Sequence, residues 1–282
     1  MPLSLIWLAR MGTRQPGFWE AHYAPQNAAL VLTGDISEAE ARETAGKYFG
    51  SWRGEANAAA PPTPAAPHVP ARRIIIVDKP GAPQTVLVAF GIGLPRNTTD
   101  YPAVEIMNGI LGGLFSSRIN MNLREKNGYT YGAFSTFSYH RGTGPLLSGS
   151  MVRTDVTAPA TRELFSELQR IQTDPPTAAE LKTSQEHALR SLPGHFETVD
   201  DTARQIGDLF VYKLPVDYFR ALPQQYQAVT LQDVQKAAAD HINPEHLLIV
   251  AVGDRAKIEP GLQKLNLGPI ERRNESGDPV TK

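Results

Sequence analysis

Residues 241–254 read HINPEHLLIVAVGD, and this stretch decides the fold because residues 22–35, HYAPQNAALVLTGD, repeat its pattern. Histidine, proline, glycine and aspartate occupy offsets 0, +3, +12 and +13 in both copies, with six mostly apolar residues before the glycine. The shared pattern predicts a proline turn, a buried strand and a Gly-Asp stop. Because the copies lie 219 residues apart, the repeated unit is a domain rather than a solenoid repeat. A chance match between two proline turns, each followed by a strand, is the alternative.

The repeat predicts one complete domain preceded by the tail of a homologous domain. The first copy closes a unit whose beginning would lie upstream of Met1, so we expect a fragment or a misassigned start. Prolines at 61, 62, 64, 67 and 70 crowd an alanine-rich stretch and indicate an extended linker. We therefore divide the chain into a carboxy-terminal remnant of a first homologous domain (1–54), a Pro/Ala-rich linker (55–72), a complete domain (73–270) and a polar tail (271–282).

The pattern of the complete domain predicts an α+β fold. Helical spacing and cap residues indicate helices that start after 98–100, 177 and 230, and others over about 116–126, 155–172 and 197–212. Apolar or alternating stretches indicate strands at 73–77, 85–91, 129–139, 145–152 and 247–252. This order favours a mostly antiparallel sheet with helices packed on one face.

Charge and composition exclude several classes of function. With 28 Lys and Arg against 29 Asp and Glu, the net charge of -1 offers no broad basic field for nucleic acid or an anionic membrane. No apolar run approaches the ~20 residues that a membrane helix needs. The absence of cysteine excludes disulfides, thiolate metal sites and cysteine nucleophiles. We expect neither a nucleic-acid partner nor a membrane partner.

The histidines do not match a metal site. A zinc hydrolase helix places two histidines four residues apart, with a glutamate beside them as the general base. The nearest pair, His241 and His246, has a spacing of five, and Pro244 interrupts any helix there. A polar turn between helix and strand explains this stretch better, and we assign no metal ligand in this chain.

The stretch LREKNGYTYG at residues 123–132 has the pattern of a carbonyl-binding site. Arg124 on a short helix is followed seven residues later by Tyr131, just inside a strand, and Gly128 turns the chain back between them. A cation and a phenol that converge can donate hydrogen bonds to a carbonyl oxygen that acquires negative charge. The structural alternative makes Tyr131 an aromatic core residue and Arg124 a solvated helix charge, and the residues taken alone favour it.

This stretch resembles the carboxy-terminal half of the pitrilysin/insulinase superfamily of zinc metallopeptidases, the inverzincins. The branch it resembles has two-domain subunits and includes the mitochondrial processing peptidases. The similarity runs through residues 78–81, 91–96, 111–132, 150–155 and 253–254, with the Leu-Arg-Glu-Lys-x-Gly-x-x-Tyr core as its most specific part. Residues 18–52 resemble the end of the preceding domain in that family.

The resemblance implies a division of labour between two homologous halves. One half carries an inverted His-x-x-Glu-His zinc motif, and the other carries an Arg and a Tyr that hold the substrate carbonyl. By this resemblance Arg124 and Tyr131 are the catalytic and substrate-binding positions, with Tyr129 as the fallback tyrosine. This chain lacks the zinc motif, so we expect zinc in a homologous partner half or subunit. The chain would then be the non-zinc-binding member of a heterodimer that hydrolyses peptides, and would not be catalytically complete alone.

Two other interpretations stay open. One is a catalytically inactive structural or peptide-binding subunit of the same fold. The other is a truncation product that exposes apolar surface where its first half is absent. Bacterial relatives make the periplasm a candidate compartment by resemblance, while the sequence leaves compartment, substrate and partner undecided.

Overall fold

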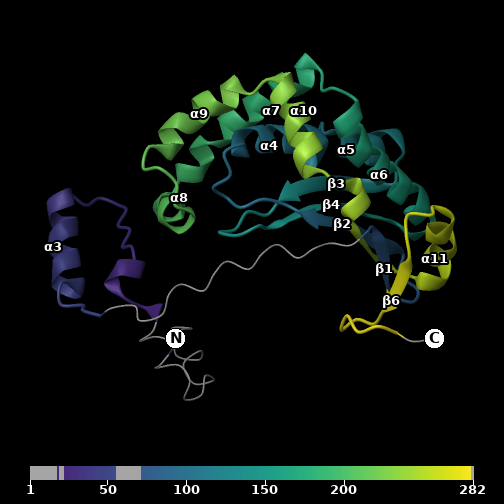
Figure 1. Cartoon of the computed structure of the whole chain (residues 1–282), viewed down its shortest axis with the longest axis horizontal. Coiled ribbons are helices and arrows are strands. Elements are labelled where there is room, and N and C mark those ends of the chain that lie inside the picture. Colours follow the sequence, from purple (N-terminus) through teal and green to yellow (C-terminus); the bar gives the residue numbers. More distant parts are fainter. Residues whose placement is uncertain (1–17, 19–21, 55–70, 281–282) are drawn as a thin grey trace. The chain divides into compact units, whose positions relative to one another are not determined.

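The computed structural model describes residues 18, 22–54 and 71–280, which form two compact units. The larger unit comprises the described residues 71–192 and 215–280. It contains a mixed six-stranded sheet with helices packed on one face (Figure 1). This arrangement confirms the predicted α+β class.

The sheet has the strand order β3-β4-β2-β5-β1-β6. Neighbours from β3 through β4 and β2 to β5 pair antiparallel, whereas β1 pairs in parallel with both β5 and β6. The sheet is therefore mixed, with antiparallel pairs in the majority. The strands are β1 Arg73–Asp78, β2 Gln84–Ile92, β3 Thr130–Phe137, β4 Pro145–Arg153, β5 Leu248–Gly253 and β6 Ile270–Arg273.

The strand β6 was not predicted, and it lies across the predicted start of the polar tail. Its sequence, IERR, lacks the apolar pattern of a strand. Pairing with β1 holds β6 in a strand conformation that its own sequence does not favour. Ile74 lies opposite Ile270 and donates its amide to the Pro269 carbonyl oxygen at 2.9 Å. Two arginine–glutamate contacts secure the edge, including Arg272 Nη2 to Glu259 Oε1 at 2.6 Å.

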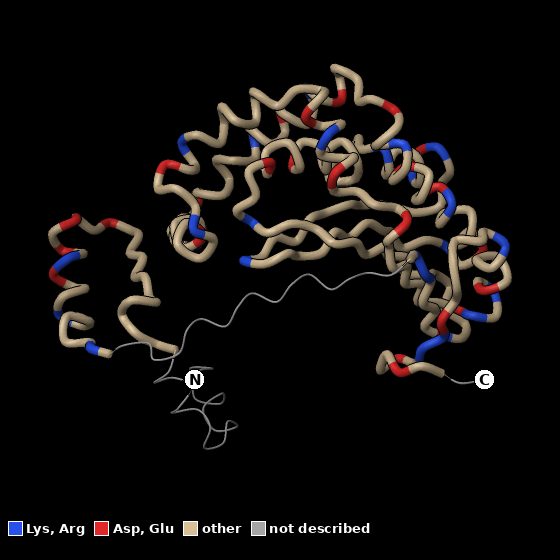
Figure 2. Tube along the Cα trace, in the orientation of Figure 1, with Lys and Arg blue, Asp and Glu red and all other residues tan. Residues whose placement is uncertain are grey.

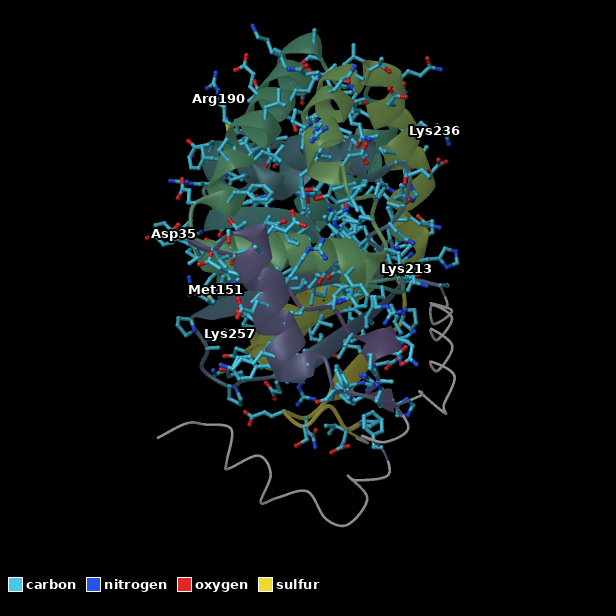
Figure 3. The ribbon with its side chains drawn as sticks, turned by 90° about the vertical axis from the view of Figure 1, so that its left-hand side faces the viewer. Asp35, Met151, Arg190, Lys213, Lys236 and Lys257 are labelled. Carbon is cyan, nitrogen blue, oxygen red and sulfur yellow. The ribbon has the colours of Figure 1, made fainter. Side chains whose placement is uncertain are left out.

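The helices of the larger unit gather on one side of the sheet, with α11 at the β1–β6 end (Figure 1). Figure 3 shows the labelled Arg190 and Lys236 at the outer side of this helical layer. No helix among the described residues is long and apolar enough to cross a membrane. The helical segments of this unit are α4 Tyr101–Asn108, η2 Gly109–Gly113, α5 Arg118–Asn120, η3 Met121–Lys126, η4 Thr154–Val156, α6 Thr157–Thr173, α7 Ala178–Ser191, α9 Tyr218–Ala228, α10 Leu231–His241, η6 Pro244–His246 and α11 Arg255–Lys264.

The hydrophobic core lies between these helices and one face of the sheet. Alternate residues of the central strands are buried there, with Leu87 on β2 and Ile76 on β1 both opposite Ala251 on β5. Alternation is a consequence of the pleat, which sends successive side chains to opposite faces. The helix α4 and the turn η2 after it contribute the buried residues Ile106, Met107, Ile110 and Leu111.

Two local features differ from the sequence prediction. The cap was predicted within residues 98–100, and Asp100 holds the cap position without a side-chain bond to α4. Its carboxylate binds Thr98 and lies 2.5 Å from Nε2 of His241 on α10. The segments after residues 108 and 120 widen into π-helical turns, η2 and η3. Such turns are rare in proteins overall, and many of those known lie at functional sites.

The smaller unit comprises the described residues 18, 22–54 and 193–214. Its segments are η1 Pro25–Asn27, α3 Glu38–Phe49, η5 Pro193–Phe196 and α8 Val199–Tyr212. The Thr33 hydroxyl donates to the Val199 carbonyl oxygen at 3.0 Å. Contacts therefore group α8 with the amino-terminal segment.

The two copies of the repeat have different environments. Leu30 and Leu32 in the first copy are 50% and 38% exposed, whereas Ile249 and Ala251, at the matching positions of β5, are fully buried. Within the described part of the chain, the first copy belongs to no sheet. Residues 1–17, 19–21 and most of the predicted linker lie outside the described residues, so the domain boundaries remain predictions.

Candidate functional site

Arg124 lies on the π-helical turn η3, and the chain reverses directly after it. The Gly128 amide donates to the Arg124 carbonyl oxygen at 3.0 Å, and the Tyr129 amide donates to that of Leu123 at 2.9 Å. Gly128 has a φ of +63°, in the left-handed region that glycine adopts without a Cβ penalty. As a result β3, which carries Tyr131, begins beside η3.

The buried Asn122 ties η3 to α6. Its Nδ2 donates to Oε1 of Glu167 at 2.5 Å, and Glu167 also accepts from Arg170 at 2.9 Å. The adjacent Leu123 is fully buried in the core. Hydrogen bonds between buried side chains of different elements hold those elements in place. The backbone of Arg124 is therefore fixed while its side chain remains at the surface.

The guanidinium of Arg124 is stacked on an aromatic ring. Its Cζ lies 4.4 Å from the ring centroid of Phe115, and its Nε is 3.3 Å from Oε1 of Glu125. The contact with Glu125 is solvent-exposed and contributes little, whereas stacking on the ring orients the guanidinium plane. The N–H groups of a guanidinium lie in its plane. Stacking therefore leaves donors free to bind an oxygen at the edge of the group.

Arg118 on α5 anchors the same segment to α7. Its Nε and Nη2 donate to the two carboxylate oxygens of Glu180 at 2.6 and 3.0 Å, and the Thr177 amide donates to the same carboxylate at 2.7 Å. Burial opposes the charge of this carboxylate, yet the hydrogen bonds from Arg118 and Thr177 lower the pKa of Glu180 to about 2. The carboxylate is therefore ionised over the whole physiological range.

Tyr131 is one of the most exposed large side chains of the described chain, at 90%. The alternative that made it an aromatic core residue is wrong. Tyr129 is half-buried, with its backbone bonded to Leu123 on one side and to Arg153 on the other. The side chains of Arg124 and Tyr131, both within the described residues, form no hydrogen bond with each other. The structure places them on adjacent segments, with Arg124 half-buried and Tyr131 exposed.

A β-bulge explains the exposure of Tyr131. Thr130 lies opposite Val152 and Ala133 opposite Ser150, so two residues of β3, Tyr131 and Gly132, share one position on β4. Bulges re-aim side chains and are frequent beside active sites.

Two hydroxyl groups hold this bulge. Thr130 Oγ1 donates to the Met151 carbonyl oxygen at 2.7 Å and accepts from the Gly132 amide at 3.1 Å. The buried Ser150 Oγ lies 2.7 Å from the Gly132 carbonyl oxygen, to which it donates. The bulge is thus bonded on both sides, and its shape is fixed by side chains rather than by the strand ladder.

The free edge of β3 is covered beyond the bulge. Ala133 donates its amide to Oδ1 of Asn120 at 3.0 Å. A Cβ at Gly112 would lie 2.4 Å from the Ser135 amide nitrogen, so only glycine permits η2 to approach this closely. Covered edges do not accept an added strand. Among the described elements of this end of the sheet, the bulge itself remains accessible.

Sequence reasoning found the two surface residues and missed the residues that hold them. Asn120, Asn122 and Ser150 are buried polar residues whose partners come from other elements. All three lie within the segments that carry the family resemblance. Short polar residues within these segments were the one sequence feature that could have indicated such buried hydrogen-bonding positions.

The described residues contain no group of three or more His, Asp and Glu side chains that could hold a metal ion. His241 pairs with Asp100 instead of facing a second histidine. The residues present in the described ranges therefore do not fit a zinc ion.

A second polar cluster lies away from the Arg124 site, between α4, α9 and the end of β3. The Arg96 guanidinium stacks on Tyr101 at 3.8 Å from the ring centroid, and its Nη1 donates to the Tyr218 hydroxyl at 2.8 Å. Tyr139 donates to Oε1 of the neighbouring Glu105 at 2.9 Å. Burial raises the pKa of Glu105, and the hydrogen bond from Tyr139 partly opposes this. The cluster joins two helices to a strand end and is structural.

Comparison with known proteins gives the family. The family model described as the peptidase M16 inactive domain matches residues 17–187, more than half of the chain. The chain therefore belongs to the M16 peptidases and contains their inactive domain. This confirms the resemblance to the zinc metallopeptidase superfamily inferred from the sequence.

Solved structures of relatives share the fold. The chain has a TM-score of 0.76 and 27% identity to the crystal structure of a peptidase M16 inactive domain from Pseudomonas fluorescens, with 86% of this chain and 58% of that chain covered. A protease from Helicobacter pylori gives a TM-score of 0.76 at 20% identity, with coverages of 87% and 60%. At that lower identity, the likeness shows the fold alone.

Two curated relatives match shorter stretches. An uncharacterized zinc protease of Mycobacterium leprae is 24% identical over 135 residues, which are 48% of this chain and 30% of that protein. A "probable inactive metalloprotease" of Bacillus subtilis is 29% identical over 79 residues, which are 28% of this chain and 18% of that protein. The matched stretches span less than a third of each of these relatives.

Proposed function

We propose that this chain is the non-zinc half of a zinc metallopeptidase and that Arg124 and Tyr131 bind the substrate carbonyl in trans. The observation that carries the proposal is a half-buried guanidinium and an exposed phenol on adjacent, firmly held segments. The guanidinium is stacked on Phe115, and the phenol stands on a bulge held by two hydroxyl groups. Donors fixed in advance stabilise a developing oxyanion without reorganising during the reaction.

The partner in this proposal is a homologous half or subunit that carries His-x-x-Glu-His and the zinc ion. Such a partner would supply the metal and its bound water, while the present chain binds and orients the peptide carbonyl. Membership of a zinc peptidase family and the lack of a metal site in the described residues support this division. A heterodimer is the corresponding assembly.

The first copy of the repeat offers a second reason to expect a homologous partner. Leu30 and Leu32 are exposed, although the matching residues of β5 are buried between strands that pair on both sides. A strand like β5 gains its burial from neighbours equivalent to β1 and β2. We therefore propose that residues 28–33 complete the sheet of a homologous half.

The test is reconstitution with a zinc-binding subunit, obtained by co-expression with neighbouring open reading frames. In the purified pair we expect Arg124→Ala and Tyr131→Phe each to lower kcat by about 10²–10³-fold, the effect of losing one oxyanion donor. Tyr129→Phe tests the fallback tyrosine, and we expect it to retain activity. Arg190→Ala, at a 79% exposed side chain on the outer helical layer, is the matched control.

Three results would contradict the proposal. The first is unchanged activity in both Arg124→Ala and Tyr131→Phe. The second is robust peptidase activity of the chain alone with one zinc per chain. The third is a stable pair that cleaves no peptide, which would favour the alternative of a catalytically inactive structural or peptide-binding subunit.

A further inference from the structure

The sequence contains two Asn-Gly pairs, Asn108–Gly109 and Asn127–Gly128. A glycine after asparagine favours deamidation, because glycine has no Cβ to obstruct the attack of its nitrogen on the asparagine side chain. The nitrogen attacks the side-chain amide carbon and a C–N bond forms, while the amide nitrogen leaves as ammonia with the proton of the attacking nitrogen. Water then opens the cyclic imide to aspartate or isoaspartate. The fold gives these two identical pairs different environments.

The fold protects the first pair. Asn108 ends α4 with a helical φ of −63° and ψ of −37°. The Gly109 amide continues the helix and donates to the carbonyl oxygens of Glu105 and Ile106. Gly109 is also buried, and a Cβ there would lie 2.2 Å from Oγ of Ser184. Attack by this nitrogen would therefore require both the helix and the core around it to open.

The second pair lies at the exposed turn after η3. Gly128 is exposed, with open space where a Cβ would lie, and its amide donates to the Arg124 carbonyl oxygen at 3.0 Å. Charged residues at 124–126 precede this pair, whereas residues 106–117 around the first pair carry no charge (Figure 2). Charged side chains stay at the surface in contact with water. Water therefore reaches the second pair once its turn opens.

The side chain of Asn127 holds this turn closed. Its Nδ2 donates to the carbonyl oxygen and to Oδ1 of Asn122, at 2.9 and 2.7 Å. At a ψ of −17°, the Gly128 nitrogen points away from the side-chain carbon of Asn127. Ring closure requires the peptide unit between them to rotate, which breaks the hydrogen bond from Gly128 to Arg124. Opening of a single exposed turn costs less free energy than opening of a buried helix.

We propose that Asn127–Gly128 is a site of spontaneous deamidation in the folded chain, and that the reaction releases η3 from the turn that leads into β3. In the isoaspartate product the backbone runs through the former side chain, which adds a carbon atom to the chain between Arg124 and Tyr131. The turn that places β3 beside η3 is thereby lengthened. The loss of activity that follows rests on the proposed function, whereas the modification site does not.

Either product also adds a negative charge at this turn. In the aspartate product the carboxylate stands where Asn127 donates to two oxygens of Asn122, so repulsion replaces two hydrogen bonds. Asn122 is itself bonded to the carboxylates of Glu163 and Glu167. The new charge therefore lies near two others of the same sign, which repel it. The network that holds η3 to α6 is weakened as a result.

The test incubates the full chain at pH 8.5 and 37 °C, with and without 8 M urea, and follows deamidation by mass spectrometry. Trypsin separates the two pairs into the peptides 97–118 and 127–141. In the folded chain we expect Asn127 to deamidate at least about tenfold faster than Asn108. In urea we expect the two rates to agree within about threefold, because the protection of Asn108 comes from the fold.

Asn127→Asp copies the aspartate product and tests its effect. Hydrogen exchange of the amides at 127–132 should be several-fold faster than in the wild type. In the reconstituted pair, kcat should fall by at least about tenfold, because small displacements of positioned groups slow catalysis strongly. Asn274→Asp adds the same charge at an exposed residue after β6 and is the matched control, which should change neither readout.

Two results would overturn the modification site: deamidation of Asn108 as fast as that of Asn127 in the folded chain, or an unmodified Asn127 after a time that converts both pairs in urea. Unchanged hydrogen exchange in Asn127→Asp would overturn the release of η3. If Asn127 deamidates and exchange accelerates, but the reconstituted pair cleaves no peptide, the proposed function fails and this inference stands.

Discussion

Replacing Glu180 by glutamine should destabilise the chain at neutral pH and much less in acid. Glu180 accepts hydrogen bonds from Arg118 and Thr177, and its pKa lies at about 2 instead of the ordinary 4.5. The fall of this pKa from 4.5 to about 2 corresponds to at most ~3.4 kcal/mol of stability. Because the side chain is 28% exposed, solvent screens part of this, and we expect about 2 kcal/mol.

The sign of the pH dependence follows from the lowered pKa. The unfolded chain binds a proton at Glu180 near pH 4.5, while the folded chain resists protonation down to about pH 2. The stabilisation is therefore fully present above the unfolded pKa and is lost as the pH falls toward 2. In Glu180→Gln the side-chain oxygen can still cap α7, but no group titrates. The difference between wild type and variant should thus shrink steadily below pH 4.5.

Urea unfolding followed by circular dichroism at 222 nm, at pH 7, 4.5 and 3.5, measures this difference. Glu186→Gln is the matched control on the same helix, because Glu186 makes only exposed contacts with Lys182 and Arg190. We expect the control to change stability by less than about 0.5 kcal/mol at each pH. A difference between wild type and Glu180→Gln that is equal at pH 7 and 3.5 would refute the argument.

Three further predictions follow from packing and from the division into units. Leu123→Ala removes a fully buried side chain of η3 and should lower the free energy of unfolding by about 2–5 kcal/mol. Met121→Ala, at an exposed position of the same turn, should lower it by less than about 1 kcal/mol, and urea unfolding measures both. Gly112→Ala would place a Cβ 2.4 Å from the Ser135 backbone nitrogen and should lower Tm by several degrees. Gly207→Ala in α8, with open space around it, should leave Tm unchanged or raise it. A larger loss of Tm in Gly207→Ala than in Gly112→Ala would be evidence against the covered edge of β3. All three tryptophans precede residue 53, so their fluorescence reports on the amino-terminal segment while circular dichroism reports mainly on the larger unit. We expect the two urea transitions to differ in midpoint, and coincident transitions would show that the units unfold together.

The family and the main elements were readable from the sequence because they depend on local patterns. The alternation of β2 and the capping box of Thr177 with Glu180 follow from residues close in the chain, and the structure confirms both. The prediction failed where a distant partner decides the outcome. The strand β6 exists because β1 offers it an edge, and Asp100 binds His241 on α10 instead of capping its own helix.

The sequence by itself singled out Arg124 and Tyr131 as the pair that we propose to hold a carbonyl, because they belong to a motif that resembles one of a zinc peptidase family. Only the tertiary structure decided how they are presented. Taken alone, the residues favoured a buried Tyr131, because an aromatic residue at the start of a strand usually joins the core. The bulge reverses that outcome, and it depends on hydroxyl groups of Thr130 and Ser150 that come from two different strands. Contacts between residues far apart in the chain have no local sequence signature, so the exposure of Tyr131 follows from the fold alone.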